Sequence, residues 1–250
     1  MAALVVLVAA VVAAGAWYYL AGRARGTPPA AAVSAATTSA PLAESPPVAT
    51  TLPPLEQMDP YARDLLATLG TSPLLLKWLA TDDLVGAIAT AIDKLAQRQS
   101  PARDLAVLRP TEGFAVARRN GVVLVAPATY ARYGPLVDTV AAIDSARLAA
   151  AFTTLKPRIA EAYRRQGHPD GGFDPALARA IAIVVATPDV PADAALVPGI
   201  GGYAYANPAF EQLPPAQKQL IRMGPEHAAR VRDAARRFAA ALAATPTTAR

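Results

Sequence analysis

The 250-residue sequence contains no cysteine and only two histidines. The absence of cysteine excludes disulfide bonds, thiolate metal sites and cysteine nucleophiles. The two histidines, His168 and His227, stand in no metal-ligand spacing such as HExxH, so we predict no metal site. GxSxG, SxxK and P-loop motifs are also absent. The sequence therefore assigns no catalytic residue and no cofactor.

Charge is scarce as well. Charged residues make up 17% of the chain, and its 24 basic and 19 acidic residues leave a net charge of +5. Of the basic residues 20 are arginine, and alanine accounts for 61 positions, a usage typical of a high-GC genome. Because the basic excess is small and spread along the chain, we do not expect nucleic-acid binding.

The first 22 residues form the longest apolar stretch. Residues 2–22 contain no charge and no proline, and about twenty residues at ~1.5 Å each span the ~30 Å hydrocarbon core of a bilayer. The cluster Trp17, Tyr18 and Tyr19 suits a membrane–water interface. We predict a transmembrane anchor over residues 1–22, with the lipid bilayer as its partner. Alternatives are a cleaved signal peptide, favoured by the small residues 14–16, and a buried core helix.

Residues 23–54 are predicted to be a disordered linker. Residues 26–54 hold seven Pro, eight Ala and eight Ser or Thr, with Glu44 as the single charge. Such a segment buries too little surface to offset its conformational entropy. A tether of this kind favours a single-pass protein of the inner membrane whose C-terminal domain is periplasmic. Arg23 and Arg25 favour the cytoplasmic side by the positive-inside rule, so this alternative stays open.

Helical patterns begin at Leu55. Pairs such as Asp59-Pro60 mark helix starts, and apolar residues then recur at helical spacing. Residues 114–125 differ, because Asn120-Gly121 between apolar runs predicts a β-hairpin. The expected fold class is mainly α: a compact multi-helix domain over 55–244 with one small hairpin, preceded by the transmembrane helix and the linker. Residues 245–250 are expected to be a disordered tail.

A dinucleotide-type pattern occurs once. Residues 199–204 (Gly-Ile-Gly-Gly-Tyr-Ala) match GxGxxG/A by letters. That motif requires a preceding strand and a helix that opens within it, whereas here the flanking segments are rich in proline and glycine. We interpret residues 199–204 as a turn.

Two clusters of polar and aromatic residues remain as candidates for contact with a partner. The first cluster follows the hairpin, and the second lies where the last two predicted helices meet. Structural ion pairs and helix caps would explain both clusters, and a recognition surface is the alternative, since Arg, Tyr and His are frequent in contacts. The clusters are Tyr130, Arg132 and Tyr133, and Lys218, Arg222, Glu226 and His227.

Three local strings resemble an uncharacterised bacterial family, domain of unknown function 3014. The resemblance covers residues 55–242, and it implies a membrane-anchored protein of the cell envelope without an assigned activity. His227 stands where the family has Asn. The strings are residues 130–133 (Tyr-Ala-Arg-Tyr), residues 155–167 with Leu-Lys-Pro, Glu-Ala-Tyr and Gly, and residues 218–226 with Arg-Met-Gly-Pro-Glu at their end.

These observations predict a membrane-tethered, non-enzymatic binding or scaffolding protein of the bacterial cell envelope, with an envelope protein as partner. A first alternative is an envelope hydrolase with a site near Arg222, Glu226 and His227. A second is an adaptor that acts on other membrane proteins through its span.

Overall fold

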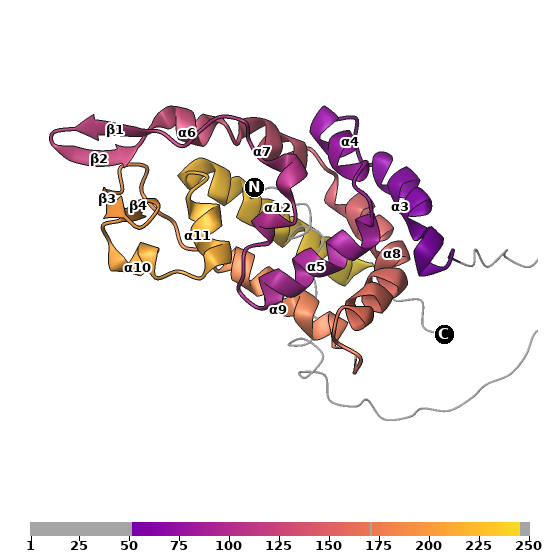
Figure 1. Cartoon of the computed structure of the whole chain (residues 1–250). Coiled ribbons are helices and arrows are strands. Elements are labelled where there is room, and N and C mark those ends of the chain that lie inside the picture. The colour runs from indigo at the N-terminus through magenta and orange to yellow at the C-terminus, as the bar shows by residue number, and fades with distance from the viewer. Residues whose placement is uncertain (1–51, 171, 246–250) are drawn as a thin grey trace, which may run out of the picture.

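The computed structural model describes residues 52–170 and 172–245 of the chain. In Figure 1 the described chain forms a helical body with a small sheet at one end. The helices are α3 (Met58–Ala67), α4 (Pro73–Leu79), α5 (Leu84–Ala96), α6 (Pro127–Ala131), α7 (Gly134–Ala141), α8 (Ser145–Arg165), α9 (Phe173–Val185), α10 (Pro208–Glu211), α11 (Pro215–Ile221) and α12 (Pro225–Ala244), with short 3₁₀ turns at Leu55–Gln57, Pro101–Arg103 and Ala106–Leu108.

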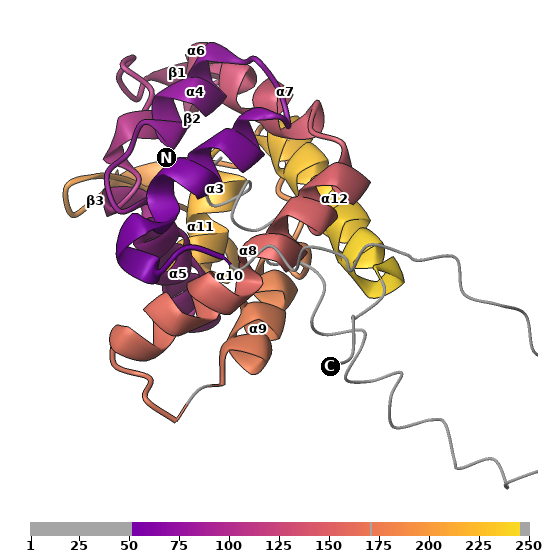
Figure 2. The same cartoon turned by 90° about the vertical axis from the view of Figure 1, so that its right-hand side faces the viewer.

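The core of the body is a bundle of amphipathic helices. Helix α5 packs against α8 and α9, and α12 crosses α7, α8 and α9. In Figure 2, α3 and α4 lie above α5, α9 lies below it and α12 lies to the right. Trp78, Phe152 and Phe238 are among the largest fully buried side chains, and Phe152 meets Phe238 edge to face. Burial of such aromatic side chains contributes strongly to the stability of a core.

Several helix boundaries follow the capping signals of the sequence. The Asp144 carboxylate accepts from the Arg147 N–H at the start of α8, and the Asp83 carboxylate accepts from the Gly86 N–H at the start of α5. Asp59 behaves differently, because its carboxylate accepts from the backbone N–H of Leu84 at 2.8 Å. Asp59 lies in the first turn of α3 but caps the neighbouring helix α5 instead of its own.

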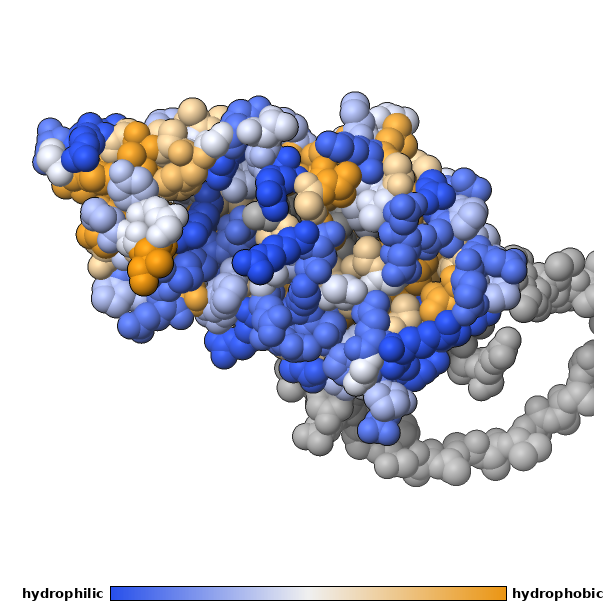
Figure 3. Space-filling model, viewed as in Figure 1, coloured by the Kyte–Doolittle hydropathy of each residue, from blue (hydrophilic) through white to orange (hydrophobic). Residues whose placement is uncertain are grey.

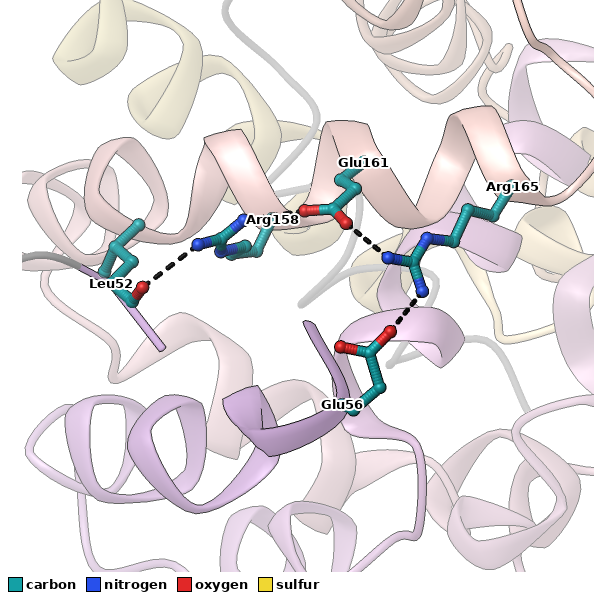
Figure 4. A network of polar contacts seen from close by, with 5 residues as sticks. All are labelled: Leu52, Glu56, Arg158, Glu161 and Arg165. Carbon is teal, nitrogen blue, oxygen red and sulfur yellow. Dashed lines mark hydrogen bonds and ion pairs between the residues drawn. The ribbon is translucent and has the colours of Figure 1, made fainter. Parts of the chain in front are cut away.

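Figure 4 shows a polar network that holds the first described residues on α8. Arg158 donates to the Leu52 carbonyl at 3.0 Å and to Glu161 at 2.7 Å, and Arg165 bridges Glu161 and Glu56. The hydrogen bond from Arg158 lowers the pKa of Glu161, with help from the charge of Arg165. The chain is thus fixed to the body from Leu52 onward. Helix α8 runs through Pro157 as one continuous helix.

The sheet has four antiparallel strands in the order β1-β2-β3-β4: β1 (Val116–Arg119), β2 (Val122–Val125), β3 (Leu196–Gly199) and β4 (Gly202–Tyr205). The two hairpins join where Val123 pairs with Leu196. One sheet face covers a second, smaller core, which α10 and α11 close from the other side (Figure 1). Its buried members are Val125, Val190, Leu196, Tyr205 and Ile221.

The expected fold class is wrong in two respects. The mainly helical character is present, but the chain forms two hairpins in one sheet where a single hairpin was expected. In addition, no helix among the described residues has the length and apolar character needed to cross a bilayer. The predicted anchor at residues 1–22, residues 23–51 of the predicted linker and the tail from 246 lie outside the described residues.

Candidate functional site

A cavity of about 300 Å³ opens between the sheet and the helical body. Its walls come from the segment before β1, from both hairpins, from the α6–α7 junction and from α11. The lining is aromatic and basic, and no carboxylate belongs to it within the described part of the chain. The lining residues are Phe114, Val125, Arg132, Tyr133, Leu196, Gly201, Gly202, Tyr203, Tyr205, Gln219 and Arg222.

The cavity brings together members of both clusters predicted from the sequence. Arg132 and Tyr133 come from the first cluster and Arg222 from the second, and all three line the same cavity. These residues lie about 90 positions apart in the sequence. Their proximity results from the packing of the α6–α7 junction beside α11.

Arg132 is held in place by neutral partners. Its guanidinium donates to the Glu112 carbonyl at 2.8 Å and to the Tyr133 hydroxyl at 3.0 Å, and it lies 4.9 Å from the centroid of the Tyr133 ring. Its Nε is buried and has no hydrogen-bond partner. Among the residues that the structure describes, Arg132 forms no ion pair with a carboxylate. A positive charge at the cavity wall is therefore left without a counter-charge.

Arg222, the cavity residue from the second cluster, is held by the sheet. It donates to the Tyr203 carbonyl of β4 at 3.3 Å, and its nearest carboxylate oxygen belongs to Glu211 at 3.9 Å. Glu211 is engaged elsewhere, because it accepts from Lys218 at 2.7 Å and from the Tyr205 N–H at 2.9 Å. Burial raises the pKa of Glu211, but the hydrogen bonds from Lys218 and Tyr205 outweigh it and leave that pKa below its ordinary value.

Lys218 thus serves the architecture of the site. Its ammonium group neutralises Glu211, which in turn ties the end of β4 to α10 and α11. This is the structural role that the sequence left open for the second cluster. Lys218 lies 2.7 Å from Glu211 whereas Arg222 lies 3.9 Å from it, so the Arg222 guanidinium keeps hydrogen-bond donors for another partner.

Tyr130 forms the joint between the two clusters. A Cβ atom built on Gly224 would lie 2.9 Å from the Cγ and Cδ1 atoms of Tyr130, so the tyrosine ring rests on the bare glycine backbone. Gly224 has φ 101° and ψ 157°, a conformation that is open essentially only to glycine. The Gly of the Arg-Met-Gly-Pro-Glu string is therefore required by this contact. Burial raises the pKa of the Tyr130 hydroxyl.

Thr129 ties the same junction to the first hairpin. Its side chain is 1% exposed, and its hydroxyl accepts from the Ala115 N–H at 2.8 Å and donates to the Ala115 carbonyl at 2.9 Å. Nothing in the sequence pattern marks Thr129 as a contact residue. A threonine in a short helix gives no signal for such a bond, because its partner lies 14 residues upstream.

The aromatic wall of the cavity was also missed. Phe114 and Tyr203 lie with ring centroids 6.2 Å apart, and the buried Tyr205 hydroxyl donates toward the Ile221 carbonyl at 3.5 Å. Burial raises the pKa of Tyr205 far above its ordinary value, so this hydroxyl stays protonated. The alternation Tyr203-Ala204-Tyr205 was the available signal, since it has the period of a half-buried strand.

Glu226 and His227 lie in the first turn of α12, away from this lining. Glu226 is exposed, and the His227 Nδ1 is 3.0 Å from the Met223 carbonyl. Within residues 52–170 and 172–245, no hydrogen bond or ion pair joins Arg222, Glu226 and His227, and of the three only Arg222 lines the cavity. The structure does not assemble the constellation that the hydrolase alternative needs.

The other histidine forms a separate contact. The His168 Nε2 is 3.0 Å from an Asp93 carboxylate oxygen, and its ring stacks on Tyr163 with centroids 4.1 Å apart. These contacts fasten the end of α8 to α5. No group of three or more His, Asp or Glu side chains with the geometry to hold a metal ion occurs among the described residues.

Comparison with known proteins gives one match. The family model described as "Protein of unknown function (DUF3014)" matches residues 84–239, which is more than half of the 250-residue chain. The match supports the resemblance to a family of unknown function, and it bears on neither a membrane anchor nor a bacterial source. No curated protein and no solved structure matches the chain.

Proposed function

We propose that this chain, which belongs to the DUF3014 family, is a non-enzymatic binding protein whose cavity between sheet and body receives an anionic ligand. The observation that carries the proposal is the placement of Arg132 and Arg222 on one cavity without a lining carboxylate. Planar guanidinium groups bind carboxylate and phosphate groups through paired hydrogen bonds.

The rest of the lining defines the other half of the ligand. Phe114 and Tyr203 offer ring surface, and Leu196 and Val125 contribute apolar side chains. A ligand with an anionic head and an apolar or aromatic body matches both parts of the wall. A cavity of about 300 Å³ lies at the small end of the range for such sites.

The binding hypothesis is favoured over the envelope hydrolase by the arrangement of polar groups. A general base must lie within hydrogen-bond reach of the group it activates. Glu211 is the carboxylate nearest to Arg222 among the contacts of the described chain, and it is occupied by Lys218 and the Tyr205 N–H. The cell-envelope location and the envelope partner expected from the sequence stay predictions.

Thermal unfolding of the full chain with three probes tests the proposal: benzoate, phenyl phosphate and the neutral benzyl alcohol. A ligand at ten times its Kd adds about 1.4 kcal/mol to the free energy of unfolding. For a domain of this size we expect a rise in Tm of about 3–5 °C. Benzoate and phenyl phosphate together report the shared anionic chemistry, and the stronger of the two identifies carboxylate or phosphate as the preferred head.

Variants of the two arginines provide the controls. Arg132→Met and Arg222→Met are each expected to abolish the rise in Tm, whereas Arg222→Lys should retain part of it. Arg236→Met is the matched control, because Arg236 pairs with Asp233 on the exposed face of α12. The proposal fails if neither anion raises Tm at 10 mM, if benzyl alcohol raises it equally, or if the arginine variants respond like the wild type.

A further inference from the structure

The turns of the two hairpins lie at the same end of the sheet. Strand β2 begins just after the turn at Asn120-Gly121, and β3 ends at the turn that contains Ile200. Val123 near the start of β2 pairs antiparallel with Leu196 at the start of β3, so β3 runs toward the end of the sheet where β2 begins, and both turns lie at that end. We call residues 118–122 and 197–202 the hairpin tips. In Figure 1 the hairpins form the end of the molecule remote from α3, α4 and α8.

Apolar side chains are exposed on the hairpin tips. Ile200 is 111% exposed, Val197 is 43% exposed and Val122 is 42% exposed. These are three of the five large apolar side chains that are exposed among the described residues, and a fourth, Phe114, borders the cavity beside them. Figure 3 shows apolar surface at this end of the molecule beside a hydrophilic outermost tip, and further apolar patches over the helical body. Exposed apolar groups concentrated at one projecting end mark a contact surface.

The charge within the two hairpin segments has a single sign. Residues 113–137 contain three arginines and no acidic residue, and residues 194–210 contain no Lys, Arg, Asp or Glu. Arg118 and Arg119 are exposed on the first tip. Across the described residues no carboxylate pairs with either of them. The surface that covers this end should therefore carry negative charge as well as an apolar layer.

We propose that the hairpin tips dock this protein on the surface of an anionic lipid bilayer. Ile200, Val197 and Val122 enter the boundary between headgroups and acyl chains, and the Arg118 and Arg119 guanidinium groups contact the headgroups. A bilayer surface fits better than an acidic protein because the tips project and need no shaped counterpart, and because the boundary layer accepts apolar side chains beside cations. The turn backbone stays within reach of headgroup water, so its polar groups remain solvated.

The magnitudes agree with a reversible contact. Burial of one isoleucine side chain strengthens partitioning by roughly ten- to hundredfold. Each arginine near an anionic membrane surface adds roughly fivefold. This docking rests on side chains that do not line the cavity and needs no occupant there, although Gly201 and Gly202 of the second tip border the cavity.

The absence of cysteine from the chain provides a clean test. Ile200→Cys in the full chain carries one environment-sensitive nitrobenzoxadiazole label, and Leu76→Cys is the matched control. Leu76 is also a large exposed apolar residue, at 47%, but it lies on α4, far from the tips (Figure 1). Vesicles of phosphatidylcholine alone are compared with vesicles that contain about a third phosphatidylglycerol. Because the label reports its own surroundings, another membrane-binding segment of the chain cannot imitate the signal.

We expect a blue shift and a several-fold rise in emission for the label at position 200 with anionic vesicles, and none for the label at position 76. Arg118→Gln with Arg119→Gln should weaken the apparent partitioning of that label by roughly 25-fold. The proposal is overturned if the chain sediments with vesicles while the label at 200 stays in water, if both labels shift equally, or if neither responds. A shift without lipid that grows with protein concentration would instead assign the tips to a second copy of this chain, and would overturn it too.

Discussion

Substitution of Gly224 tests whether the contact with Tyr130 fixes the joint between sheet and body. Gly224→Ala places a methyl group 2.9 Å from two atoms of the Tyr130 ring, closer than carbon atoms approach in proteins. It also forces alanine into a conformation at φ 101° and ψ 157°. Strain in such a region costs about 1–3 kcal/mol. With the displacement of the ring added, we expect a loss of about 3 kcal/mol in the free energy of unfolding.

The assay is thermal unfolding followed by circular dichroism, for which this loss corresponds to a fall in Tm of roughly 6–12 °C. Gly201→Ala is the matched control. Gly201 has φ +76°, but a Cβ atom there would meet nothing within 4 Å. Its substitution should cost only the backbone strain, about 1 kcal/mol. The difference between the two glycines isolates the collision with Tyr130 and the stricter backbone requirement at Gly224.

A double-mutant cycle with Tyr130→Ala separates these two contributions. Removal of the ring opens space for the new methyl group. The free energy of unfolding lost by the double variant should therefore be about 1–2 kcal/mol smaller than the sum of the two single losses. The backbone strain remains in both backgrounds and cancels. If Gly224→Ala costs no more than Gly201→Ala, or if the coupling lies within about 0.5 kcal/mol of zero, the assignment of Gly224 as the seat of Tyr130 is refuted.

Three further substitutions test the surrounding contacts. Glu211→Gln should cost about 1 kcal/mol at pH 7, because it removes a charge-assisted hydrogen bond that is partly exposed. The folded-state pKa of Glu211 lies below its ordinary value of 4.5, so the stability that its charge contributes is present above 4.5 and is lost as pH falls through the folded-state pKa; thermal melts from pH 7 to pH 3 should therefore show the Tm of the variant and of the wild type converging. Arg232→Met should cost about 2 kcal/mol in urea unfolding, because Arg232 is only 7% exposed and donates to the Thr187 carbonyl. Asp189→Asn, at the exposed ion-pair partner of Arg232, should cost under about 1 kcal/mol, and equal losses for the two variants would contradict this reasoning. Thr129→Val should cost about 2 kcal/mol and speed amide exchange in β1, and unchanged exchange there would show that the hydroxyl does not hold the hairpin.

The helical body was largely predictable from the sequence because its signals are local. At the start of α8, for example, the capping carboxylate of Asp144 and the N–H of Arg147 that it accepts from are only three residues apart. Asp59 shows where this reasoning ends. Its neighbour Pro60 marks a helix start, yet its carboxylate caps α5 some 25 residues later. A cap that comes from another helix depends on tertiary packing, which has no local signature in the sequence.

The second hairpin was missed for a physical reason. Pro198 within a strand lacks the N–H that a central strand needs, so its presence argues against such an assignment. The sheet avoids this conflict because β3 pairs with β2 at Leu196 alone, and Pro198 lies beyond that pairing. The turn assignment for residues 199–204 agrees with the structure at Gly199–Gly202, where β3 turns into β4.

Part of the candidate site was predictable from the sequence, and the part that belongs to the second hairpin was not. Arg132, Tyr133 and Arg222 are conspicuous by residue type, and the structure places all three on one cavity. The cavity itself was not predictable, because Tyr203 and Tyr205 come from the hairpin that was missed. Glu226 and His227 follow Arg222 closely in the sequence, but the start of a new helix at Pro225 leaves them outside the lining.

The rigidity of the joint bears directly on binding. Two separate contacts hold the elements around the cavity together: the Tyr130 ring of α6 rests on Gly224, and Glu211 lies between Lys218 and the Tyr205 N–H. With both in place, the two arginines keep their spacing before any ligand arrives, so little conformational entropy is lost on binding. Gly224→Ala should therefore weaken anion binding as well as stability, although Gly224 does not line the cavity. A cavity that forms only around its ligand would show the opposite pattern, with a loss of stability but unchanged affinity among the folded molecules.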